Sequence, residues 1–147
     1  MHNGIIIVFH NDEKNINVEQ LVSIIKKNNY KICLVNNAST DNTIAFLEQI
    51  KIQFDLNSKV FVLDNKHNKG LKNALKFGAR FLQSQTNFNA IIYLESKMTP
   101  YLKYISQYFT QLTLEKSSFN AIPTRSSRNS LKDVYDLKEL LKVNYNV

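Results

Sequence analysis

The sequence holds a single cysteine among its 147 residues, so an internal disulfide is excluded. Cys33 lies inside an apolar run, and we expect it to be a small buried side chain. No apolar run approaches the ~20 residues needed to cross a bilayer, so no membrane span is expected. The N-terminus also lacks the basic and apolar regions of a secretory signal. A cytoplasmic protein is therefore the expectation.

The sequence is also poor in patterns that bind metals or nucleic acids. Its three histidines form no metal-ligand spacing with the cysteine, and there is no zinc knuckle and no arginine-rich tract. The net charge of +7 attracts phosphates of any kind without choosing between them. Tyr101, Tyr104 and Tyr108 fall at helical spacing and make no aromatic stacking array on a strand. A nucleic-acid-binding domain is therefore the weakest functional hypothesis, and no nucleic-acid partner is expected.

Four apolar runs are interrupted by segments with helical spacing, which predicts an α/β fold. With 44% hydrophobic residues and no internal repeat or linker, residues 1–147 are expected to form one domain. The repeated alternation favours a mostly parallel sheet with helices on both faces, a three-layer α/β/α sandwich of Rossmann-like type. The predicted strands are Ile5–Phe9, Ile32–Val35, Lys59–Leu63 and Ala90–Leu94.

Helices are predicted where apolar residues recur at intervals of three and four. A loop is expected from Ala121 to Ser130, and the remaining C-terminal part, about 101–147, is expected to be helical and to pack on the sheet or on a neighbour. The predicted helices cover Val18–Ile25, Ile44–Phe54, Gly70–Ser84, a segment from Pro100 through Leu112, and Leu131–Val143.

The polar cluster after the second strand, Asn36–Thr43, leads directly into a helical pattern. A strand end followed by a helix start is where open α/β sheets bind nucleotides. The segment resembles the "VVDNxSTDxT" motif of family-2 glycosyltransferases, whose GT-A fold holds a nucleotide-diphospho-sugar. The resemblance implies that Asn36, an amide in place of the family's aspartate, contacts the base. Ser39 and Asp41 match "STD", although helix capping alone could explain them.

Two further segments resemble motifs of the same family. Ile5–Glu13 is similar to the opening strand "VIIPTYNEE", which implies that Phe9, Asn11 and Asp12 line the nucleoside pocket. A strand that ends in a polar turn and a helix cap is the alternative. Asn68–Gly78 is similar to "NxGxxxAxNxG", and its first glycine would let backbone amides approach an anion. Lys69 would then reach phosphate.

The fourth motif bears on activity. Ile91–Lys97 stands where the family has "xxxLDxD", whose aspartates hold Mn²⁺ or Mg²⁺ on the donor diphosphate. Here Glu95 is the only candidate ligand, and Lys97 would repel a cation that requires several oxygen ligands. No metal cofactor is therefore expected, and weak Mn²⁺ or Mg²⁺ binding stays open. Lys97 could replace the cation as a fixed positive charge, or the motif could be that of an inactive copy.

The resemblance covers about residues 4–100, and no general base or acceptor half is found beyond it, so no catalytic residue is assigned. One hypothesis is a glycosyltransferase-like protein that binds a UDP-, GDP- or dTDP-sugar and transfers the sugar. The alternative is a non-catalytic GT-A-like module that binds a nucleotide or a protein, and a homo-oligomer is also open. The expected donor site, at the carboxyl ends of the first, second and fourth strands, comprises Phe9, Asn11, Asp12, Asn36, Ser39, Asp41, Lys69, Glu95 and Lys97.

Overall fold

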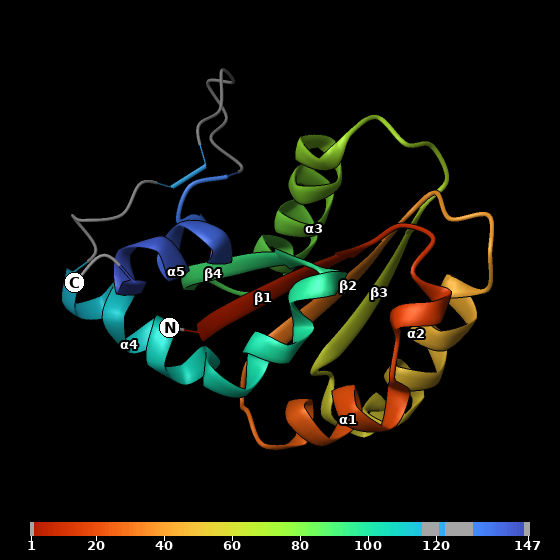
Figure 1. Cartoon of the computed structure of the whole chain (residues 1–147), viewed down its shortest axis with the longest axis horizontal. Coiled ribbons are helices and arrows are strands. Elements are labelled where there is room, and N and C mark those ends of the chain that lie inside the picture. Colours follow the sequence, from red (N-terminus) through yellow and green to blue (C-terminus); the bar gives the residue numbers. More distant parts are fainter. Residues whose placement is uncertain (1, 116–120, 123–130, 146–147) are drawn as a thin grey trace.

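The computed structural model describes residues 2–115, 121–122 and 131–145. Within these ranges the strands form one sheet in the order β3-β2-β1-β4-β5, and every neighbouring pair is parallel. Figure 1 shows β1 at the centre of the sheet. The α/β fold and the shared sheet of the four predicted runs are thus confirmed. The strands are β1 (His2–Phe9), β2 (Lys31–Asn37), β3 (Val60–Asn65), β4 (Phe88–Glu95) and β5 (Val134–Asp136).

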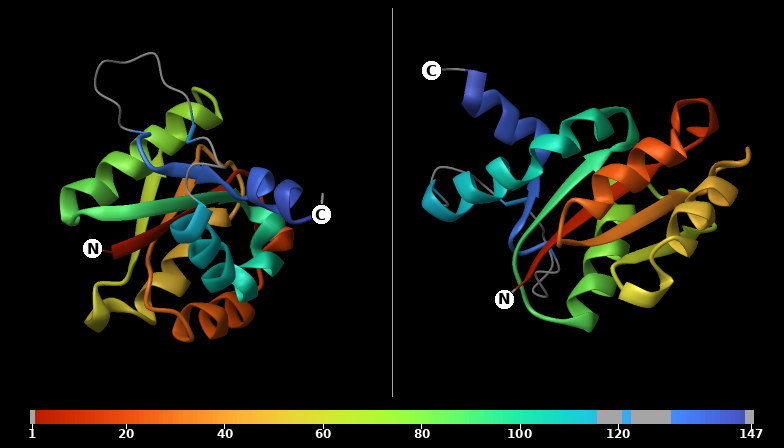
Figure 2. Two further views of the ribbon diagram at one scale, coloured as in Figure 1. Left: turned by 90° about the vertical axis from the view of Figure 1, so that its left-hand side faces the viewer. Right: turned by 90° about the horizontal axis from the view of Figure 1, so that it is seen from below.

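The helices cover both faces of this sheet (Figure 2). One face packs against α3, with Leu131 and Ile122 beside it, and the other packs against α1, α2, η3, α4 and α5. The helices are α1 (Val18–Lys26), α2 (Thr43–Ile52), α3 (Leu71–Gln85), α4 (Ile105–Glu115) and α5 (Leu137–Tyr145), with the 3₁₀ helices η1 (Glu13–Asn15), η2 (Asp55–Asn57) and η3 (Ser96–Tyr104). No helix among the described residues is long and apolar enough to cross a bilayer.

The central strands are apolar because both of their faces are covered. Every residue from Ile5 to Phe9 is buried, and successive side chains enter the two opposite layers of the core. In register, Ile7 lies between Leu34 and Leu94. At the carboxyl ends of β1, β2 and β4, polar side chains follow the apolar residues of the strands.

Gly78 explains how closely α3 approaches the sheet. A Cβ atom at this position would lie 3.2 Å from both Ile6 and Val35. Close packing on the sheet therefore explains a glycine inside this helix. Gly70, directly before the helix, has a φ of 95°. That conformation is open to glycine and rarely adopted by other residues.

The prediction of one helix over Leu131–Val143 is wrong at its start. Residues 134–136 form strand β5, which pairs in parallel with β4, and the helix begins only at Leu137. Val134 and Tyr135 are buried in opposite core layers, as alternate residues of a strand are. The apolar spacing alone fits a helix, but pairing with the open edge of β4 decides the structure. Of the expected loop at 121–130, the structure describes only 121–122.

Candidate functional site

A cleft of about 310 Å³ opens at the carboxyl ends of β1, β2 and β4, beside the first turn of α3. Open parallel sheets bind ligands at this position. Of the residues expected from the sequence, the cleft brings Asp12, Glu95 and Lys97 together. The full lining is Val8, His10, Asp12, Asn37, Asn68, Leu71, Glu95, Ser96 and Lys97.

The alternation of side chains along a strand decides which residues reach the cleft. Val8 and the neighbouring Asn37 belong to the face covered by α3, and both line the cleft. Phe9 is fully buried in the opposite core layer, so it does not line the cleft. Asn36 precedes Asn37 and points to the same side as Phe9, away from the cleft. The structure therefore does not bring Phe9 and Asn36 together with Glu95.

Asn36 instead connects β2 to its surroundings. Its Nδ2 donates to Asp64 Oδ1 at 2.9 Å, and its Oδ1 accepts a hydrogen bond from the Ser39 hydroxyl. The side chain is 2% exposed, so both hydrogen bonds satisfy a buried amide. A hydrogen bond from Lys66 and a weaker one from Asn36 hold the pKa of Asp64 below its ordinary value. Base contact by Asn36 would require this network to open.

Three further expected residues fasten the loop after β1 to the loop after β2. The Asn11 backbone N–H donates to Ser39 Oγ at 2.9 Å, and the Glu13 N–H donates to Asp41 Oδ2 at 3.2 Å. Asn11 Oδ1 accepts from the Thr40 N–H at 2.8 Å. These bonds cross between segments 28 or 29 residues apart. They fix the shape of the cleft rim and leave the three side chains outside the lining.

Asp41 also contacts the start of helix α2. Its Oδ1 accepts both the backbone N–H and the hydroxyl of Thr43, the first residue of α2, but the N-cap position is Asn42, whose side chain makes no capping hydrogen bond. The Thr43 hydroxyl is the main cause of a lowered pKa at Asp41, and backbone N–H groups add to it. In the preceding turn, Ala38 has a φ of 54°. The left-handed conformation of a non-glycine residue here reflects how tightly the loop is held.

Several cleft residues were missed by sequence reasoning. The ring of His10 donates from Nδ1 to the Asn37 carbonyl at 2.6 Å, and the His10 backbone N–H donates to Asp12 Oδ2 at 2.7 Å. Asn68 Oδ1 accepts from the Gly70 N–H at 2.9 Å. Strand alternation could have found Asn37, because it points opposite to Asn36. Asn68 is the first residue of the third motif, but no binding role was predicted for it.

Two lysines lie near this end of the cleft. Lys138, in the first turn of α5, places its Nζ 3.4 Å from Glu95 Oε1, although Lys138 itself is not part of the lining. Lys97 lines the same cleft as Glu95, whereas Lys69 is exposed and outside the lining. No group of three or more histidine, cysteine, aspartate or glutamate side chains in the described part of the chain could hold a metal ion. The cleft lining holds two carboxylates, Asp12 and Glu95, and Lys138 Nζ lies 3.4 Å from Glu95, whereas a hard divalent cation requires several oxygen ligands.

Lys138 is held at the cleft by the end of β5. Asp136 Oδ1 accepts the Lys138 backbone N–H at 2.9 Å, and the Tyr93 hydroxyl donates to Asp136 Oδ2 at 2.9 Å. Burial, and then the hydrogen bond to Asp136, raise the pKa of Tyr93 well above its ordinary value. No local signal in the sequence could have found Lys138, because β5 was predicted as helix.

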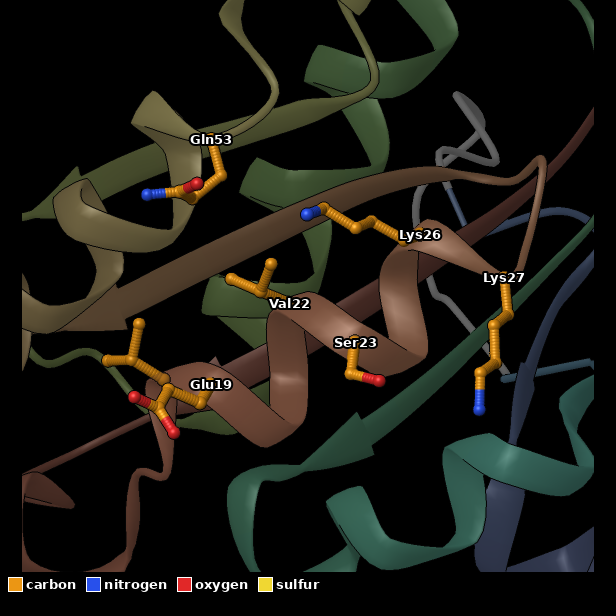
Figure 3. A pocket seen from close by; sticks show the side chains of 7 residues that line it. Glu19, Val22, Ser23, Lys26, Lys27 and Gln53 are labelled. Carbon is orange, nitrogen blue, oxygen red and sulfur yellow. The ribbon is translucent and has the colours of Figure 1, made fainter.

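A larger groove of about 500 Å³ lies on the outer surface of α1, next to Gln53 at the end of α2 (Figure 3). Figure 3 shows Val22 between Glu19 and Lys26 along this groove. No strand residue and no residue of the four motifs lines it. The cleft at the strand ends is therefore the better candidate site.

Comparisons with known proteins identify the family and the type of fold. The family model "Glycosyl transferase family 2" matches residues 4–97. The fold is similar to that of the mannosyltransferase PcManGT from Pyrobaculum calidifontis in complex with GDP-Man and Mn²⁺, with a TM-score of 0.62 and 14% identity over 89% of this chain and 37% of that chain. It is also similar to S. aureus TarS 1–349 in complex with UDP, with a TM-score of 0.50 and 18% identity over 77% of this chain and 33% of that chain. No curated protein sequence matches the chain.

Because the sequence identities are low, these likenesses establish the fold alone, which is of the GT-A type. The chain spans little more than a third of the length of PcManGT, 37%. The family match ends at residue 97, so Lys138 and the rest of α5 lie outside it.

Proposed function

Because this chain belongs to glycosyl transferase family 2, we propose that its cleft at the ends of β1, β2 and β4 binds a nucleotide-diphospho-sugar. The observation that carries the proposal is that residues from all four motif segments line one cleft. Asp12 comes from the first segment, Asn37 from the second, Asn68 from the third and Glu95 from the fourth. Segments far apart in the sequence thus supply one binding surface.

The cleft offers suitable groups for such a ligand. The amide side chains of Asn37 and Asn68 can both donate and accept, as recognition of a base or a ribose hydroxyl requires. Asn37 Nδ2 donates to Asn68 Oδ1 at 3.5 Å and Asn37 Oδ1 accepts from Asn65 at 3.2 Å, so a ligand would replace these bonds. Leu71, which begins α3, also lines the cleft, and the backbone N–H groups of a first helical turn favour anions. PcManGT was solved with GDP-Man and TarS with UDP, so guanosine and uridine nucleotides head the donors to test for this chain.

A non-catalytic nucleotide-binding module is the second candidate. The observation that favours it is the Glu95–Lys138 ion pair, which occupies the one carboxylate of the degenerate motif. No carboxylate of the chain is assigned as a general base, and positioned acid–base groups contribute about 10²–10⁴-fold to rates. We therefore expect the isolated chain to be a poor or inactive transferase that still binds nucleotide.

The first test is a thermal-shift screen of UDP, GDP, dTDP and CMP, with and without Mn²⁺. A ligand that binds only the native state raises the melting temperature by mass action. We expect one nucleoside diphosphate to raise it, and Asn68→Ala in the cleft to reduce that rise by at least half. Gln53→Ala in the α1 groove is the matched control and should leave it unchanged. No shift with any nucleotide at millimolar concentration, or a loss with Gln53→Ala alone, would contradict the proposal.

The second test separates the enzyme from the module. The chain is incubated with the corresponding nucleotide-sugars, and release of the nucleotide is followed over time. Turnover on the order of one per second, abolished by Glu95→Ala, would establish a transferase, because typical enzymes work in that range. Binding without turnover would establish the module.

A further inference from the structure

We propose that Lys138 and Lys97 together bind the diphosphate of the donor and take the place of a divalent cation. This inference rests on the proposed function and names the groups that would recognise the diphosphate. Lys138 lies 41 residues beyond the end of the family match, at residue 138 against residue 97. Nothing in the four motifs assigns it a role.

The topology of the sheet brings Lys138 to the cleft. Asp136 pairs with Tyr93 in register, so β5 ends beside the last residues of β4. Helix α5 starts directly afterwards, and its first turn therefore lies at the same sheet edge as Glu95. The hydrogen bond from the Lys138 N–H to Asp136 fixes the backbone from which the lysine side chain extends.

Two ammonium groups lie near the one carboxylate of the fourth motif. Lys97 lines the same cleft as Glu95, and Lys138 Nζ is 3.4 Å from the Glu95 carboxylate. The other carboxylate of the cleft, Asp12, accepts the backbone N–H of His10 and belongs to the loop after β1. A divalent cation beside Glu95 would face two ammonium groups, whereas phosphate oxygens would be attracted by both.

The ion pair itself is easily exchanged. The side chains of Lys138 and Glu95 are 42% and 38% exposed, and their closest atoms are 3.4 Å apart. Pairs with this exposure contribute little to stability because solvent screens them. Lys138 can therefore exchange its carboxylate for a phosphate oxygen at small cost.

The test is titration calorimetry with a nucleoside and its diphosphate, in EDTA and in Mn²⁺. We expect the wild-type chain to prefer the diphosphate in EDTA and to gain less than twofold from Mn²⁺. Lys138→Met should weaken diphosphate binding about tenfold, the value of one charge-assisted hydrogen bond, and leave nucleoside binding unchanged. Lys142→Met is the matched control, because Lys142 is on the same helix and pairs with Glu139 instead.

Glu95→Gln gives a second readout, because the two readings of Glu95 predict opposite changes in diphosphate affinity. If the lysines bind the diphosphate, removing the competing carboxylate should tighten diphosphate binding in EDTA. If Glu95 is a metal ligand, the same substitution should weaken binding in Mn²⁺. Lys138→Met within twofold of wild type, or a tenfold gain from Mn²⁺, would overturn the inference while nucleotide binding itself stands. Absence of any nucleoside or nucleotide binding would overturn the proposed function and the inference with it.

Discussion

The attachment of β5 and α5 to the sheet can be tested at the Tyr93 hydroxyl. This group donates to Asp136 at 2.9 Å, and the tyrosine is 8% exposed. Tyr93→Phe keeps the buried ring and removes only the hydrogen bond to a charged acceptor. Asp136 still accepts the Lys138 N–H in this variant. The loss of stability should therefore lie at the low end of the range for hydrogen bonds to charged groups. We expect the free energy of unfolding to fall by about 1.5 kcal/mol and the melting temperature by about 4 °C.

The assay is urea unfolding followed by circular dichroism, with Tyr104→Phe as the matched control. Tyr104 is 43% exposed in η3, so its hydroxyl should contribute almost nothing. A Tyr93→Phe effect no larger than that of the control would refute the view that this hydrogen bond fastens the C-terminal segment. The same variant should weaken diphosphate binding slightly, because Asp136 positions Lys138.

The raised pKa of Tyr93 adds a dependence on pH. Below the ordinary tyrosine value of 10.0, the phenol is protonated in both the folded and the unfolded state, and its contribution to stability is complete. Above that value the unfolded phenol ionises first, which favours unfolding. The wild type should therefore lose stability above pH 10 faster than Tyr93→Phe. The difference between their free energies of unfolding should narrow as the pH rises. A gap that is constant or widens would contradict the assigned cause.

Four further predictions follow from the packing, the loops and the cleft. Gly78→Val should destabilise the fold by about 2 kcal/mol in urea unfolding, since its side chain would be forced against Ile6 and Val35, whereas Asn73→Val on the exposed side of α3 should cost far less. The lowered pKa of Asp41 means that its contribution is present above its ordinary value of 3.8 and is lost as the pH falls further, so Asp41→Asn should flatten the acid side of the stability profile; an unchanged slope would count against it. Burial raises the pKa of the Cys33 thiol to about 12, and a disulfide reagent at pH 8 should label it only in urea; rapid labelling of the native chain would be the opposite result. Lys97→Asp should gain Mn²⁺ affinity in calorimetry, because it restores a second carboxylate near Glu95, and no gain would mean that Lys138 still repels the ion.

Much of the fold was predictable because its strands are buried on both faces. Ile5–Phe9 and Ile32–Val35 are continuous apolar runs bounded by polar segments. This pattern is typical of central strands in a parallel sheet. The residues of 134–136 carry no comparable signal. Their strand exists only because the edge of β4 is available for pairing, and that edge is a property of the folded sheet.

The cleft was predictable in place but only partly in its residues. The motifs predicted a site at the carboxyl ends of the strands, and the structure has a cleft there that Asp12, Glu95 and Lys97 help to line. Motif matching cannot tell which of two adjacent side chains points to the cleft, so Asn36 was chosen where Asn37 lines it. Lys138 could not be predicted, since its position depends on a strand pairing 43 residues away along the chain from Glu95.

The short strand β5 also covers an edge of the sheet that could otherwise promote aggregation. The outer edge of β4 is apolar, with Ile91 and Ile92 almost completely buried, and its backbone groups would be unpaired without β5. An open, apolar edge strand is a template for pairing with another copy of the same chain, and hence for aggregation. The backbone N–H of Ile122 donates in turn to Val134 at 2.9 Å, which covers part of the new edge. A chain cut after α4 would keep the whole family-matched segment, yet we expect it to precipitate rather than fold into a smaller working domain.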